Sequence, residues 1–287
     1  MPGFWTSVAL LGALYAACFA GKRFYKNEKR RRIIASPFPG SWKRTLLKNV
    51  SLYRKIPPAL REKLNNSIKL FIAEKRFEGC NGLVVTDEIR VIIAGQACML
   101  LMNRPNKNYP GLTSILVYPS AYLAPGRMHI EGGAYVEGPQ IRAGESWTRG
   151  VVVLAWDHVQ RESARNYGGK NVVLHEFAHQ LDQEDGRANG VPILSDQSRY
   201  ASWSTVFQNN YQKLRNRAHQ EDTLLDEYGT LNPAEFFAVA TETFFKKPLE
   251  MKLQEPELYG ELEEYYRIDP AEWFDPEKED ESPYPLQ

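Results

Sequence analysis

The stretch that decides the fold runs Asn-Val-Val-Leu-His-Glu-Phe-Ala-His-Gln-Leu-Asp, at residues 171–182. Its centre is the pattern H-E-x-x-H, formed by His175, Glu176 and His179. Because residues four apart on an α-helix lie on one face, the two histidines can bind the same metal ion. Glu176 lies about 100° further round the helix, where it can deprotonate a water that the metal activates. Zinc suits the pattern best, since two imidazoles and one further ligand leave a fourth position open.

A core helix without a metal is the alternative for this stretch, its histidines bonding to backbone or carboxylate groups. Val172, Leu174, Phe177 and Leu181 are apolar, so the helix is expected to be buried in either case.

The composition is that of an ordinary globular protein. Of 287 residues, 43% are hydrophobic and 25% are charged, which suits one sizeable catalytic domain with appendages. The net charge of +1 argues against a general nucleic-acid-binding protein. The three cysteines, Cys18, Cys80 and Cys98, have neither the number nor the spacing of a disulfide framework or a zinc-thiolate site, which indicates a reducing compartment.

The N-terminus has the features of a membrane anchor. Residues 3–20 carry no charge and are followed at once by a basic run at 22–32. By the positive-inside rule, we expect a single-pass anchor over residues 1–21 with the catalytic domain in the cytoplasm. One alternative is an apolar helix packed on the protein itself, in a soluble cytoplasmic protein. Another is a tethered adaptor whose basic run binds anionic lipid.

The remaining sequence predicts an α+β fold with a small mixed sheet around the H-E-x-x-H helix. The run at 151–156 is either an edge strand that aligns an extended peptide or a buried central strand. Predicted helices cover residues 59–77, 87–102, 171–185, 202–219 and 257–266, with one more starting at 232; predicted strands cover 114–118 and 151–156, with a hairpin around 131–134.

A catalytic zinc needs a third protein ligand, and the sequence offers two kinds of answer. One is local, at Asp182 or Asp185, although Asp182 stands where the local pattern needs a glycine to turn the chain. The other is a glutamate on the helix that starts at 232, where Glu235 and Glu242 are seven apart and share a face. Glu235 can instead complete a helix cap, and Glu242 can instead pair with an arginine or a histidine, so spacing alone does not choose.

Several segments together resemble one known family. They are LHEFAHQLD (174–182), DGRANGVP (185–192), Tyr228, NPAEFFAV (232–239), GESW (144–147) and GVVVLAW (150–156). This combination is similar to the Mlc titration factor A family of zinc peptidases, and the similarity covers roughly residues 57–270. The resemblance implies a gluzincin whose zincin-like catalytic fold is related to that of anthrax lethal factor.

The resemblance also implies roles for individual residues. His175 and His179 match the metal-binding histidines and Glu176 matches the general base. Glu235 matches the third ligand, and Tyr228 matches a tyrosine that donates to the developing oxyanion.

Two acids remain as supporting residues beside these ligands. Glu242 is then a candidate for holding a ligand rather than binding the metal. Asp182 either orients a ligand histidine or is a solvated acid at the helix end.

The expected domain organisation follows from these assignments. Residues 1–21 are the anchor, 22–56 a basic segment and linker broken at 36–40, 57–274 the zinc metallopeptidase domain, and 275–287 an acidic, disordered tail.

The expected function is zinc-dependent hydrolysis of a peptide or protein substrate. The alternative is a metal-stabilised protein that sequesters a transcriptional regulator with little hydrolysis. Relatives in the family bind a glucose-responsive repressor, but they lack the apolar N-terminus of this chain. An intact Glu176 favours the enzyme, because a binding protein does not need it.

Overall fold

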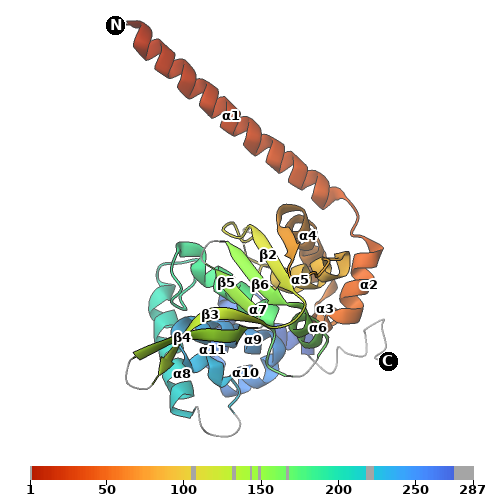
Figure 1. Ribbon diagram of the computed structural model, residues 1–287, viewed down its shortest axis with the longest axis vertical. Coiled ribbons are helices and arrows are strands. Elements are labelled where there is room, and N and C mark those ends of the chain that lie inside the picture. The colour runs from red at the N-terminus through yellow and green to blue at the C-terminus, as the bar shows by residue number, and fades with distance from the viewer. Residues whose placement is uncertain are drawn as a thin grey trace.

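The computed structural model describes residues 2–274 apart from short gaps (Figure 1). The gaps are 105–107, 131–133, 143, 148–149, 166–167 and 218–222; for 2–13, 122–142 and 147 the backbone alone is described. The predicted tail at 275–287 lies outside the described residues.

A four-stranded mixed sheet is the central sheet of the fold. Its strands are β1 (Arg76–Gly79), β2 (Ser114–Tyr118), β6 (Val151–Ala155) and β5 (Gly144–Trp147), in that order across the sheet. β6 runs parallel to β2 and antiparallel to β5, so it is an internal strand and the edge-strand alternative for 151–156 is wrong. Its near-continuous apolar run suits a strand covered on both faces.

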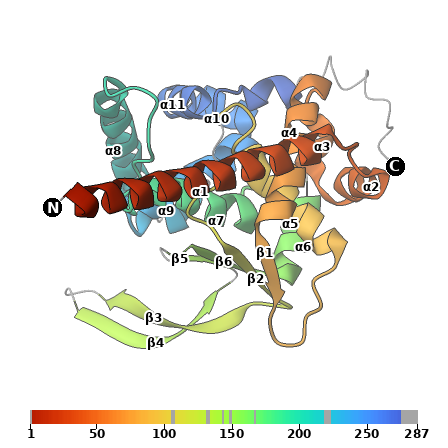
Figure 2. The ribbon, with the colours of Figure 1, turned by 90° about the horizontal axis from the view of Figure 1, so that it is seen from above.

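A separate hairpin lies beside this sheet. β3 (Tyr122–Ile130) pairs with β4 (Ala134–Arg142), Ile130 opposite Ala134, which confirms the predicted hairpin. Figure 2 shows the hairpin extending away from the helices that cover the sheet.

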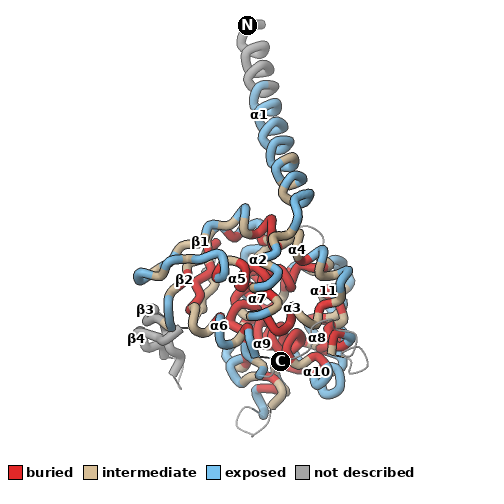
Figure 3. The backbone as a smooth tube through the Cα atoms, turned by 90° about the vertical axis from the view of Figure 1, so that its right-hand side faces the viewer, coloured by how far each residue is buried: buried red, intermediate tan, exposed pale blue. Residues whose placement is uncertain are grey.

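Four helices contribute much of the core beside the sheet. They are α4 (Pro58–Glu74), α5 (Asp87–Met99), α7 (Val172–Asp182) and α9 (Pro233–Lys246) (Figure 3). Thr86 caps α5 by accepting from the N–H of Ile89, and the helix is buried from Val91 to Met99. The helix predicted over 59–77 ends earlier than expected, because Arg76 and Phe77 pair with β2 as part of β1. Tertiary pairing thus overrides the local helical pattern there.

The core also includes residues before the expected domain boundary at 57, since Leu46, Tyr53 and Ile56 are buried in it.

The other helices surround this core. The surrounding elements are α2 (Gly40–Asn49), α3 (Ser51–Lys55), α6 (Trp156–Ala164), α8 (Arg199–Arg217), α10 (Pro248–Gln254), α11 (Pro256–Tyr266), and the short 3-10 helices η1 (Gln183–Asp185), η2 (Glu227–Thr230) and η3 (Pro270–Phe274).

The N-terminal helix α1 (Pro2–Ala35) projects from the rest of the protein (Figure 1). It ends just before the predicted break at 36–40. Lys69 of α4 holds this end, since its ammonium donates to the carbonyls of Ile34 and Ser36 at 2.7 and 2.5 Å.

The prediction of an apolar membrane anchor over residues 1–21, and of a membrane location, is wrong. Within the residues that the structure describes, no helix is long and apolar enough to cross a membrane. The uncharged run is not a separate element. The helix continues unbroken through the basic residues 22–32, so its described side chains, from Leu14 onward, include a dense run of charge.

Candidate metal centre

Helix α7 presents His175 and His179 on one face, as the spacing predicts. Asn171 starts the helix, because its side-chain oxygen accepts from the N–H of Leu174 at 3.0 Å. Phe177, on the opposite side of the helix, is fully buried in the core. The Nε2 atoms of the two histidines lie 3.2 Å apart.

Glu235 completes a cluster of three possible ligands. Its Oε2 lies 2.9 Å from Nε2 of His175 and 3.2 Å from Nε2 of His179. Burial acts to raise the pKa of Glu235, but the bonds to the two histidines outweigh it and lower the pKa to about 2. One ligand atom from each residue lies within 4.8 Å of the others, and within the described part of the chain this is the one such group.

These donors fit a metal ion. Two imidazole nitrogens from α7 and an ionised carboxylate from α9 converge on one point, and imidazole and carboxylate groups are common metal ligands in proteins. All three side chains are at least four-fifths buried. Asn232 and Pro233 place Glu235 by starting α9, since the Asn232 side chain accepts from the N–H of Glu235 at 3.0 Å.

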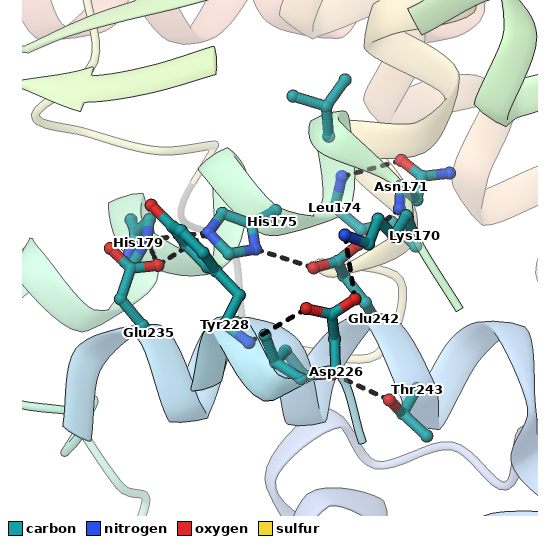
Figure 4. A network of polar contacts seen from close by, with 12 residues as sticks. Lys170, Asn171, Leu174, His175, His179, Asp226, Tyr228, Glu235, Glu242 and Thr243 are labelled. Atoms are coloured by element: carbon teal, nitrogen blue, oxygen red, sulfur yellow. Dashed lines mark hydrogen bonds and ion pairs between the residues drawn. The ribbon is translucent and has the colours of Figure 1, made fainter. Parts of the chain in front are cut away.

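Glu242 holds His175 from the other ring nitrogen. Its Oε1 lies 2.7 Å from Nδ1 of His175, and its second oxygen accepts from the N–H of Asn171. A proton on Nδ1 would leave Nε2 free to bind a metal, as supporting carboxylates do in many metal sites. Figure 4 shows Glu242 and Glu235 on opposite sides of the imidazole.

Glu176 lies in a confined space beside the cluster. Its side chain is 6% exposed, and burial raises its pKa to about 7 although His175 and His179 act to lower it. Strand β5 passes directly over the carboxyl group: a Cβ placed on Gly144 would lie 2.5 Å from Oε1 of Glu176. Only a glycine at this position leaves the carboxyl in place.

Tyr228 lies at the open side of the site. Its ring centroid is 5.8 Å from that of His175, and the residue is 50% exposed. Asp226 anchors the tyrosine by accepting from its N–H at 3.0 Å and by pairing with Lys170 at 2.9 Å (Figure 4).

The two local acids are not part of the cluster. Asp182 is fully buried and accepts from the N–H of Gly190 at 2.9 Å, so it is not a solvated acid, and the bond it makes is to a loop rather than to a histidine. Asp185 is exposed and accepts from the N–H of Arg187.

Sequence reasoning missed Gly144 and Asp226 as parts of the site. Gly144 matters because it has no side chain and so leaves space for Glu176. A single sequence does not show that a glycine is needed at this position. Asp226 was detectable in principle, because an aspartate two residues before Tyr228 has the spacing of a side chain that binds the backbone ahead of it.

Comparison with known proteins identifies the family. The family model of the glucose-regulated metallo-peptidase M90 matches residues 25–267. The chain belongs to this family. A protein of Synechocystis sp. is 41% identical over 263 residues, which cover 91% of this chain and 95% of the relative. Mlc titration factor A of Yersinia pestis and of Yersinia pseudotuberculosis is 28% identical over 226 residues, or 77% of this chain and 83% of each relative. The resemblance drawn from the sequence is thereby confirmed.

Proposed function

We propose that the protein is a zinc-dependent peptidase of the gluzincin type with a zincin-like catalytic domain that includes residues 57–274. His175, His179 and Glu235 would hold the ion. The observation that carries the proposal is the buried carboxyl of Glu176 beside these three donors. A pure metal-binding structure needs the three ligands but has no use for an acid confined in that position.

The chain's own residues supply the remaining chemistry. When bound, zinc would provide a Lewis acid that polarises a peptide carbonyl and lowers the pKa of water. Glu176, whose buried carboxyl lies beside the cluster, would take a proton from the attacking water and deliver it to the leaving amine. Tyr228 would donate to the oxyanion from the open side of the site. Glu242 would keep Nε2 of His175 directed at the ion.

A second candidate function is the binding of a regulatory protein. The relatives named Mlc titration factor A support it by their name. Tyr228 is 50% exposed and its ring lies 5.8 Å from that of His175, so it places aromatic surface next to the cluster where a protein partner could bind. The two functions are compatible, since a substrate and a regulator could use the same face.

Metal content and peptide cleavage, measured together, test the first proposal. Wild-type protein and Glu176→Gln are prepared with zinc and assayed against a peptide library. Both should retain one zinc per chain, and only the wild type should cleave. Zinc in both with cleavage by neither would reject the peptidase and favour regulator binding. Zinc in neither would reject the metal centre.

A further inference from the structure

The candidate ligands come from two helices, α7 and α9, whose relative position must be fixed for the ligands to meet. His175 and His179 lie on α7, whereas Glu235 lies in the first turn of α9, some 56 residues after the nearer histidine. A metal site loses affinity when its ligands are displaced, so something must fix the first turn of α9 against α7. The loop that follows η1 makes contacts on both sides.

Asp182 is the contact on the side of α7. It is the last residue of that helix, and its Oδ2 accepts from the N–H of Gly190 at 2.9 Å. A fully buried carboxylate bound to a main-chain N–H is costly to disrupt, because the N–H would then be buried without a partner.

Gly190 is the contact on the side of α9. Its φ is +75°, and a Cβ added to it would lie 2.3 Å from the carbonyl oxygen of Pro233. The loop backbone is therefore pressed directly against the first residue of α9. Trp203 is fully buried, and its indole N–H donates to the carbonyl of Gly190 at 3.2 Å. This bond fixes the loop a second time.

Pro233 leads directly to the third ligand. It is the first residue of α9, and Asn232 before it caps the helix through the N–H of Glu235. A displacement of Pro233 by the loop would therefore move the helix start that carries Glu235. A chain of contacts thus connects α7 to Glu235. It passes from Asp182 to Gly190 and from Gly190 to Pro233.

We infer that Asp182 and Gly190 form a clamp that sets the position of Glu235 relative to the two histidines, and thereby sets the affinity of the site for zinc. Asp182 is a positioning residue in this role and not a ligand. The inference rests on the proposed function in that it takes the cluster to bind zinc; it does not depend on peptide cleavage.

Zinc affinity, measured by chelator competition on the full chain, tests the clamp with matched variants. Gly190→Ala is compared with Gly186→Ala: Gly186 has a similar φ of +86° in the same loop, but a Cβ there meets nothing within 4 Å. Both alanines carry the strain of a left-handed residue, and only the first collides with α9. Asp182→Ala is compared with the exposed Asp185→Ala, and Asp182→Asn keeps an oxygen that can accept from Gly190.

The clamp predicts that Gly190→Ala and Asp182→Ala bind zinc about 10- to 100-fold more weakly than the wild type. Gly186→Ala and Asp185→Ala should stay within about twofold, and Asp182→Asn should recover most of the affinity that Asp182→Ala loses. Equal zinc affinity for Gly190→Ala and Gly186→Ala would overturn the clamp even if Asp182→Ala fails to fold. A wild type without zinc would overturn the metal centre together with the clamp, whereas zinc binding without peptide cleavage would leave the clamp intact.

Discussion

A methyl group at Gly144 is expected to disable Glu176 without removing the metal. A Cβ at this position would lie 2.5 Å from Oε1 and 2.7 Å from Cγ of Glu176, and 2.7 Å from a methyl of Val172. To reach an ordinary contact of roughly 3.5 Å, the carboxyl or the strand must move by about 1 Å. A misplacement of about 1 Å at reacting groups costs about 100-fold in rate, or about 2.7 kcal/mol of transition-state stabilisation.

The assay is kcat/KM for peptide cleavage, measured beside the zinc content. Gly144→Ala should lose about 100-fold in kcat/KM and keep one zinc per chain, because the collision meets Glu176 and not the ligands. Gly260→Ala is the control, since a Cβ there meets nothing within 4 Å. Full activity in Gly144→Ala would refute the reasoning about Glu176, and loss of zinc would show that the strand displaces the whole helix instead.

Three further predictions concern the supporting residues. Glu242→Gln removes the charge opposite Nδ1 of His175 and should weaken zinc binding about tenfold in a chelator competition; unchanged affinity would contradict its role. Asn171→Ala removes the cap of α7 and should lower the free energy of unfolding by about 1–2 kcal/mol in urea, whereas a loss within about 0.3 kcal/mol would show that the cap is dispensable. Lys246 is buried, and desolvation lowers its pKa to about 8. Between pH 8 and about 10.5, the unfolded chain therefore binds more protons than the folded chain, and the free energy of unfolding rises with pH. The stability of the wild type relative to Lys246→Met should therefore increase by about 2 kcal/mol from pH 8 to 10, and a difference that stays flat with pH would contradict the shifted pKa.

The local parts of the site could be predicted from the sequence. The H-E-x-x-H pattern and the Asn232-Pro233 start gave the two helices, because both signals depend on residues within one or two turns. Glu235 and Glu242 could not be separated by spacing, since they share one face of α9. The structure explains why: both contact His175, one at Nε2 and the other at Nδ1.

The parts that depend on distant contacts could not be predicted. The position of β6 inside the sheet follows from pairing with β2 and β5, which the run at 151–156 does not contain. The role of Asp182 depends on a loop that returns eight residues later. The anchor prediction treats the uncharged run at 3–20 as a separate element, whereas one helix extends from Pro2 through the basic residues to Ala35.

The central claim is that His175, His179 and Glu235 hold one zinc ion. Anomalous diffraction at the zinc edge, from crystals of the zinc-loaded protein, tests this claim most directly. The account predicts a single strong peak about 2.0–2.2 Å from Nε2 of both histidines and from a carboxylate oxygen of Glu235, with Glu242 bound to Nδ1 of His175 and not to the ion. A peak bound by Glu242 or Asp182, or no peak beside the two histidines, would contradict it.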